Sequence, residues 1–384
     1  MRRLNRLSVL DLLRSASPLS RAEMARRLGM SMPTVARIVD ELQAEGFVRA
    51  DGRDSGRLGR PGELLSFNGA AHAVLGLDLG SVCFYGTVAD LEGRIQCEVR
   101  LDGGAGPADA FDRLCLLIDR LLSGPRPSNQ RVRGIGIGVP GMVLHREGQV
   151  VWAPSLGWRD LALRGPLEER FRLPVLVEND VNLSALGELG FGAGRGLRDL
   201  VCLTVGTGVG AGIVIGGALY RGHRQAAGEV GYLVPDVALL GRPCPAFGHL
   251  ESLASAAGVV ARARAAGAGR RDLTVDDVWA AARAGEGWAL ATVDETAAYL
   301  SLAIAAINTL LDPEAIILGG GAQAAADLLL PRILERLQGL APYPPRLVAS
   351  TLGYRAAAMG AVMLVLDATT ERVVVEPVSY THLR

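Results

Sequence analysis

Short apolar segments that end in glycine or in polar side chains constrain the fold of this 384-residue chain more than any other feature. Residues 74–80, 132–139 and 174–180 each have the pattern of a buried strand, and amphipathic segments such as 108–122 have the pattern of helices. This alternation predicts an α/β body built on a mixed sheet. Because ligands bind at the carboxyl ends of strands in such sheets, the polar end of 174–180 is a candidate site.

Charge is distributed unevenly along the chain. Lys plus Arg (40) balances Asp plus Glu (40), and every basic residue is arginine. Residues 1–65 hold twelve arginines and eight acids, so this head has a net charge of +4 and the remainder has a net charge of −4. Any nucleic-acid site is therefore local to the head. The lack of lysine excludes a P-loop lysine and Schiff-base chemistry.

The head has the pattern of three short helices followed by a hairpin. Ser20 and Glu23 have the spacing of a capping box that opens the second helix, and Gly29 is placed to end it. A third helix is expected over 31–45, followed by a strand and a basic, glycine-rich loop over 53–61. This order predicts a winged helix-turn-helix.

In that fold, the third helix is the recognition helix. Its exposed N-terminal residues are expected to meet base edges in the major groove, and wing arginines are expected to contact phosphates or the minor groove. The candidate DNA-binding residues are Ser31, Met32, Thr34, Arg37, Arg57 and Arg60. The alternative is a small three-helix packing domain with a solvated arginine face.

The five cysteines are isolated, which favours free thiols in a reducing cytoplasm. The N-terminus lacks the uninterrupted apolar core of a signal peptide. Residues 200–220 are apolar enough to suggest a membrane span, but their glycines favour a strand-turn-strand.

An ordered set of motifs resembles the ROK family of sugar kinases and sugar-responsive repressors, from about residue 5 to about residue 365. These motifs are Leu77-Asp-Leu-Gly80, Gly138-Val-Pro-Gly141, Gly157-Trp158, Val177-Glu-Asn-Asp180, 204–212, Gly228-Glu-Val-Gly231, Leu250-Glu251 and Ile317-Leu-Gly-Gly-Gly321. The head resembles that of the transcription-factor branch. The resemblance implies a two-lobed, actin-like (ribonuclease H-like) sugar kinase fold over 73–366, after a DNA-binding domain over 1–68. Residues 367–384 form a tail of unassigned role.

The resemblance also implies a sugar site between the lobes. Its candidate residues are Asn179, Asp180, Glu229, Tyr232 and Glu251, and Asp180 would be the general base if the protein is a kinase. A carboxylate can accept a proton from a sugar hydroxyl, and an amide can both donate and accept hydrogen bonds. Without the resemblance, Asn179-Asp180 would be an ordinary helix N-cap, and the two glutamates would be surface acids.

Two loops resemble the phosphate-binding loops of the kinases. Their candidate residues are Asp78, Gly80, Gly206, Thr207, Gly208 and Gly210, whose backbone N–H groups would cradle a phosphate. The kinases have Gly-Gly-Thr or Gly-x-Thr after the first aspartate, whereas Ser81, Val82 and two further large residues follow Gly80 here. The phosphate side of the cleft therefore departs from the kinases more than the sugar side does.

The zinc motif of the family is incomplete. Tyr232 replaces its histidine, and Arg242, Cys244 and His249 align with its three cysteines, so two potential ligands remain where a structural zinc needs four. We expect no zinc and no resident cofactor, with ATP and Mg²⁺ required only if the protein is a kinase.

These features favour a cytoplasmic transcriptional regulator that represses carbohydrate genes and responds to a sugar. Its expected partners are double-stranded DNA with a pseudo-palindromic operator, a small sugar and a second copy of the chain. One alternative is an ATP-dependent sugar kinase, either alone or bifunctional. Another is a DNA-binding protein with a vestigial cleft, controlled by a partner protein.

Overall fold

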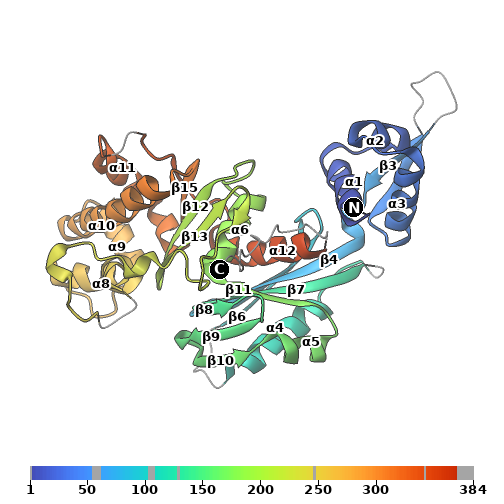
Figure 1. Cartoon of the computed structure of the whole chain (residues 1–384). Coiled ribbons are helices and arrows are strands. Elements are labelled where there is room, and N and C mark those ends of the chain that lie inside the picture. Colours follow the sequence, from blue (N-terminus) through green and yellow to red (C-terminus); the bar gives the residue numbers. More distant parts are fainter. Residues whose placement is uncertain are drawn as a thin grey trace, which may run out of the picture.

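The computed structural model describes residues 2–53, 62–102, 109–127, 130–244, 248–340 and 343–369. Its N-terminal head has three helices and a small sheet with the strand order β1-β3-β2 (Figure 1). These elements are α1 (Arg2–Ala16), β1 (Leu19–Ser20), α2 (Arg21–Leu28), α3 (Met32–Ala44), β2 (Val48–Arg53) and β3 (Glu63–Phe67). The three helices and the hairpin that follows them are those expected of a winged helix-turn-helix.

Local signals in the head act as the sequence predicts, with one difference. The Ser20 hydroxyl accepts a hydrogen bond from the Glu23 N–H at 3.2 Å, and Gly29 ends α2 with a φ of +62°. The Glu23 carboxylate, however, binds Arg26 and Arg27, so only half of the capping box forms. Two charged partners on the next turn outcompete the single Ser20 backbone N–H.

The N-terminal lobe of the body contains a five-stranded sheet with the order β11-β7-β4-β5-β6. β4, β7 and β11 are parallel, whereas β5 and β6 are antiparallel to their neighbours. A smaller sheet, β10-β9-β8, lies beside it. The elements of this lobe are β4 (His72–Leu79), β5 (Cys83–Asp90), β6 (Ile95–Asp102), α4 (Ala110–Ser123), β7 (Arg131–Val139), β8 (Met142–Leu144), β9 (Gln149–Ala153), β10 (Trp158–Ala162), α5 (Arg164–Phe171) and β11 (Val175–Asn179).

The C-terminal lobe has a second five-stranded sheet with the order β14-β13-β12-β15-β16. The apolar segment 200–220 forms its hairpin strands rather than a membrane span, as the glycines predict. The elements of this lobe are β12 (Leu200–Val205), β13 (Val209–Ile215), β14 (Ala218–Leu219), α7 (His249–Ala254), α8 (Ala256–Ala265), α9 (Val275–Arg283), α10 (Gly287–Leu311), β15 (Ala315–Gly319), α11 (Ala326–Leu337) and β16 (Leu347–Ala349).

Two helices, α6 (Asp180–Phe191) and α12 (Ala356–Thr369), pack against each other between the two sheets (Figure 1). Glycines allow their backbones to approach closely. A Cβ atom on Gly360 would lie 1.7 Å from the Leu183 carbonyl oxygen, and one on Gly76 of β4 would lie 2.1 Å from the Ala358 oxygen. α12 also continues past residue 366, where the sequence analysis placed a boundary; residues 370–384 of the predicted tail lie outside the described residues.

The core of the head continues into the body. Val362, Val365 and Leu366 of α12, together with apolar residues of β4 and β5, belong to the same buried cluster as the head helices. At this junction His72 packs against Phe47 with the two rings tilted by 37° and their centroids 4.5 Å apart. Arg133 Nε donates to His72 Nδ1 at 3.1 Å, and burial followed by Arg133 lowers the pKa of His72 to about 4. The head is therefore held by a dry core with a neutral histidine at its edge.

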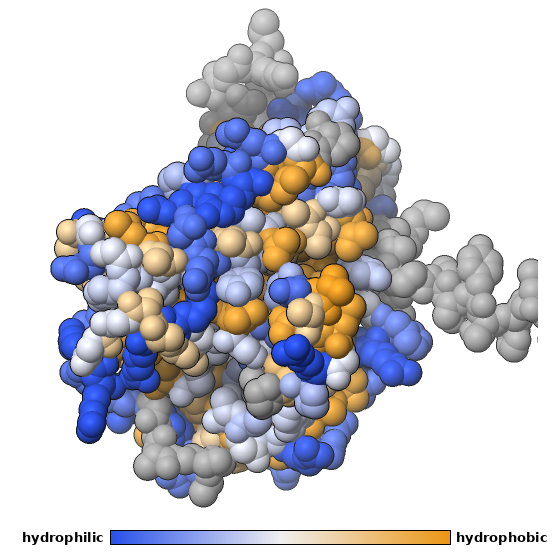
Figure 2. Space-filling model, turned by 90° about the vertical axis from the view of Figure 1, so that its left-hand side faces the viewer, coloured by the Kyte–Doolittle hydropathy of each residue, from blue (hydrophilic) through white to orange (hydrophobic). Residues whose placement is uncertain are grey.

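α10 is the one helix within the described ranges that is long and apolar enough to cross a membrane. Half of its most apolar stretch is buried in the molecule, where it packs against α8, α9 and α11. Leu302 and Leu310 are exposed on its other side. Figure 2 views the molecule from the end that carries this lobe and shows hydrophobic groups interspersed with hydrophilic ones.

The close contact between α6 and α12 predicts that a methyl group added at position 360 destabilises the protein. We expect Gly360→Ala to reduce the free energy of unfolding by about 3 kcal/mol or more, because the new Cβ would displace α12 from the Leu183 backbone. Gly165→Ala on α5 is the matched control, since no atom lies within 4 Å of its Cβ position. Urea denaturation of both variants tests the prediction, and similar stabilities would contradict it.

Candidate DNA-binding head and sugar cleft

The recognition helix α3 presents the predicted residues to solvent. Its apolar residues Val35, Ile38, Val39 and Leu42 are buried in the head. Met32 is 48% exposed, and the Ser31 and Thr34 hydroxyls are hydrogen-bonded to each other at 2.8 Å. Arg37 is exposed and forms no ion pair in the part of the chain that the structure describes. The N-terminal half of α3 therefore offers a guanidinium and two hydroxyls for base-edge or phosphate contacts.

Several other arginines of the head helices are engaged in ion pairs. Arg21 binds Asp40 and Glu63, which raises the pKa of Arg21, and Arg26 and Arg27 share Glu23. Arg37 differs from Arg21, Arg26 and Arg27 in forming no ion pair with a described residue. The predicted wing residues Arg57 and Arg60 lie outside the described residues.

Asn179 and Asp180 lie at the junction of β11 and α6. Asn179 is the N-cap of α6: its Oδ1 accepts from the Asn182 N–H at 3.0 Å, so the helix-cap alternative holds for this residue. Its Nδ2 donates to the Gly141 carbonyl at 3.0 Å and to Asp180 Oδ1 at 3.2 Å. The same Oδ1 accepts from the Val181 N–H. These bonds fix the Asp180 carboxyl group at the start of the helix and hold Asn179 beside it.

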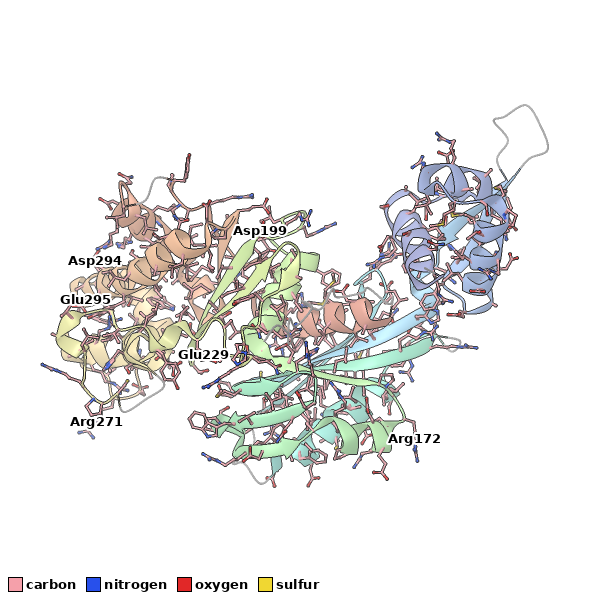
Figure 3. The ribbon with its side chains drawn as sticks, in the orientation of Figure 1. Arg172, Asp199, Glu229, Arg271, Asp294 and Glu295 are labelled. Carbon is pink, nitrogen blue, oxygen red and sulfur yellow. The ribbon has the colours of Figure 1, made fainter. Side chains whose placement is uncertain are left out.

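Three of the predicted sugar-site residues, Glu229, Tyr232 and Glu251, come from the C-terminal lobe, and Glu229 lies within electrostatic reach of Asp180. Burial, with the Glu229 charge adding to it, raises the pKa of Asp180 to about 6. Burial and then Glu251 raise the pKa of Glu229, and burial raises that of Glu251 even though its Oε2 accepts from the Val209 N–H at 2.9 Å. Burial, Glu229 and Glu251 also raise the pKa of Tyr232. Figure 3 shows Glu229 where the two lobes meet.

The two phosphate-like loops face each other directly. The Ser81 hydroxyl, after β4, donates to the Thr207 hydroxyl of the β12–β13 hairpin at 3.2 Å. The hairpin is closed by the Gly206 N–H bond to the Gly208 carbonyl at 2.9 Å. Two hydroxyl groups therefore meet where the loops would otherwise approach a phosphate. Sequence reasoning missed this contact, because nothing local pairs Ser81 with Thr207.

A cavity of about 120 Å³ lies beside these loops. Asp78 is the one residue of the predicted phosphate loops that lines it. Pockets that enclose small-molecule ligands are typically about 300–1000 Å³, so this cavity is small for a nucleotide. Its lining comprises Asp78, Asp180, Ser184, Cys202, Thr204, Gly319, Gly320, Ser350, Gly353, Tyr354, Ala356 and Ala357. Sequence reasoning did not select Ser184, Ser350 or Tyr354, which carry no local motif.

Asp78 is the most strongly perturbed carboxyl group of the cleft. Its Oδ1 is buried without a hydrogen-bond partner. Burial, with Asp180 adding to it, raises the pKa of Asp78 to about 8. At neutral pH the Asp78 carboxyl group therefore holds a proton more readily than an ordinary aspartate does.

The remnants of the zinc motif bind protein groups. Cys244 Sγ lies 3.3 Å from the Ser252 hydroxyl, and His249 Nε2 lies 3.2 Å from the Arg242 carbonyl. No three His, Cys, Asp or Glu side chains gather into a metal-binding group in the described ranges.

The chain belongs to the ROK family, whose model matches residues 74–368, and an IclR helix-turn-helix domain matches residues 5–52. The family resemblance and the two-part fold class are therefore confirmed. A putative xylose repressor of Caldicellulosiruptor sp. is 30% identical over 96% of both chains. A glucokinase of Halalkalibacterium halodurans is 36% identical over 74% of this chain and 90% of its own length.

A solved structure has the same arrangement of head and body. It is a ROK family transcriptional regulator described as a homologue of the E. coli MLC protein, with a TM-score of 0.84 and 26% identity over 96% of this chain and 97% of the other. Likeness to the repressor and the regulator thus extends over nearly the whole chain, whereas likeness to the glucokinase leaves about a quarter of it unmatched.

The Asp78 carboxyl group predicts how stability depends on pH. Because its pKa rises from 3.8 to about 8 on folding, the folded state holds the proton more tightly, so the free energy of unfolding falls as pH rises from about 4 to about 8. When the pH is raised from 5 to 8.5, the free energy of unfolding of the wild type should fall. We expect this fall to be smaller in Asp78→Asn by at least about 1 kcal/mol. Urea denaturation at both values measures this. The exposed Asp276→Asn is the control, and parallel profiles for wild type and Asp78→Asn would refute the prediction.

Proposed function

We propose that this protein is a sugar-responsive transcriptional repressor that binds DNA through its head and a sugar in the cleft between its lobes. The observation that carries the proposal is the shared core of head and body. Because Val365 and Leu366 of α12 belong to the same buried cluster as the head helices, a displacement of α12 would disturb the packing of the head against the body. The whole-length similarity to repressors and to a regulator supports the same assignment.

The cleft favours sensing over phosphoryl transfer. The Ser81–Thr207 contact joins the two phosphate-like loops, and the adjacent cavity is small. Asp180, Glu229 and Glu251 offer acceptors for the hydroxyl groups of a neutral sugar. D-xylose and D-glucose are the effectors to test first, because the similar proteins are named as a xylose repressor and a glucokinase.

The repressor would act in the cytoplasm as a homodimer on a pseudo-palindromic operator. A two-fold pair of heads requires half-sites separated by whole helical turns. A sugar can change DNA affinity only if it binds one arrangement of the lobes more tightly than the other.

The experiment is fluorescence anisotropy of the full chain on labelled DNA from upstream of its own gene, at fixed salt, with and without each sugar. Fixed salt is necessary because phosphate contacts dominate affinity. Tight, competitor-resistant binding that one sugar shifts is the expected result. If the protein binds DNA tightly but no sugar changes the affinity, the cleft is vestigial. If the protein binds no candidate DNA specifically, the repressor assignment is overturned.

The same assay tests the recognition helix. We expect Arg37→Ala to weaken operator binding about tenfold or more, because it removes the unpaired guanidinium of α3. Arg120→Ala on α4 changes net charge equally on the exposed surface of the body and should bind like the wild type. Equal losses in both variants would indicate a general charge effect and exclude base reading by Arg37.

A sugar kinase is the second candidate, supported by the position of Asp180 and by the glucokinase relative. A kinase would bind ATP and Mg²⁺ in the same cleft. If the protein is a kinase, ATP-dependent sugar phosphorylation is present in the wild type and lost in Asp180→Asn, while operator binding is unchanged. We expect no turnover in either protein. Turnover that requires Asp180 would contradict the sensor assignment.

A further inference from the structure

One loop of the C-terminal lobe rests on the N-terminal lobe beside the candidate sugar residues. The loop follows β14, spans residues 220–228 and leads directly to Glu229. Arg221 Nε donates to Glu178 Oε2 on β11 at 2.6 Å. Gln225 Oε1 accepts from the backbone N–H of His145, after β8, at 2.7 Å. The loop thus crosses the cleft at two points.

Glu178 connects the first crossing point to the sugar site. Its side chain is 2% exposed. Its Oε1 accepts from the Asn179 backbone N–H and from Asn182 Nδ2, both at 3.0 Å, while Oε2 receives Arg221. A single buried carboxylate therefore binds the loop, the backbone of Asn179 and the first turn of α6.

The second crossing point is anchored firmly in the N-terminal lobe. His145 Nδ1 lies 2.8 Å from the Val177 carbonyl and 3.5 Å from Glu178 Oε2. The Arg164 guanidinium of α5 donates to the His145 carbonyl at 2.8 Å. Both the side chain and the carbonyl of His145 are therefore held by hydrogen bonds. These bonds fix the position of the His145 N–H that donates to Gln225.

The loop is also closed on itself by a backbone hydrogen bond. The Ala227 N–H donates to the Arg221 carbonyl at 3.0 Å. Gly228 has a φ of +89°, and its carbonyl accepts from the Ala211 N–H of β13 at 2.8 Å. A side chain at Gly228 would collide with Ala211, so the chain has one route from the loop to Glu229. A displacement of Arg221 is transmitted to Glu229 along this short connection.

We propose that Arg221 and Gln225 form an interlobe latch that places Glu229 opposite Asn179 and Asp180. Neither residue is a member of the candidate sugar site, so both are positioning residues. The inference rests on the proposed function for its ligand but not for its geometry. A sugar held by both lobes binds best when the latch is formed, so the latch and the sugar stabilise the same arrangement.

The variants are Arg221→Ala and Gln225→Ala, each in the full chain. Arg224→Ala is the matched control, because Arg224 lies exposed in the same loop, carries the same charge and forms no side-chain hydrogen bond or ion pair with the described residues. Gln225→Ala leaves the Arg221–Glu178 ion pair intact, so it remains informative if loss of the partner of buried Glu178 prevents Arg221→Ala from folding.

Two measurements are made on each protein. Calorimetry gives affinity for D-xylose and D-glucose, and we expect each latch variant to bind the effector about five- to tenfold more weakly, with Arg224→Ala unchanged. Hydrogen exchange without sugar reports the latch directly. Amides of residues 221–229 should exchange at least about fivefold faster in the latch variants, whereas those of β15 should not change.

The outcomes separate this inference from the proposed function. If the wild type binds neither sugar, the sugar assignment fails for these aldoses, and hydrogen exchange alone decides whether the latch exists. If exchange over 221–229 is unchanged in both variants, the latch is overturned. Faster exchange with unchanged affinity also overturns it, because the loop would then not position the sugar site. Faster exchange together with weaker binding supports it.

Discussion

The backbone-close packing of α12 is the constraint on which the rest of this structure depends. A Cβ atom on Gly136 of β7 would lie 2.4 Å from the Ala361 carbonyl oxygen, and one on Gly187 of α6 would lie 2.2 Å from the Ala356 oxygen. The helix therefore has little freedom to shift relative to β7 or α6. Its first residues line the cavity beside Asp180, and Val365 and Leu366 near its end belong to the buried cluster that joins the head to the body. One end of α12 thus lies at the cleft and the other at the junction with the DNA-binding head. A single helix therefore connects the two sites.

The electrostatics of the cleft select among possible ligands. Asp78, Asp180, Glu229 and Glu251 all have raised pKa values, and burial is the first cause for each of them. These carboxyl groups therefore ionise less readily than usual, and they can form hydrogen bonds with hydroxyl groups. A neutral polyol supplies such hydroxyl groups. Hydroxyl groups would also replace some of the hydration that these carboxylates lose on folding.

Much of the fold could be predicted from local sequence signals. The strand pattern, the Gly29 stop and the apolar stripe of α3 each depend on residues close together in the chain, and the structure has them where they were expected. The missed features join distant residues. Ser81 meets Thr207, and Glu178 meets Arg221, and no local pattern marks either pair. The half-formed capping box shows a second limit on prediction from local motifs. The motif is present in the sequence, but the Glu23 carboxylate binds Arg26 instead of the backbone N–H of Ser20.

The matching strand orders of the two sheets have a consequence for how the lobes meet. In each lobe the first strand is central, two antiparallel strands lie on one side of it and two parallel strands on the other. The lobes are thus quasi-equivalent halves of an internal repeat. α6 and α12 each follow the fifth strand of their half, and the Ser81 and Thr207 turns each join the first two strands. The near contact of Leu183 with Gly360 lies where these equivalent helices cross, so the two halves meet through backbone atoms and a side chain at position 360 would force them apart.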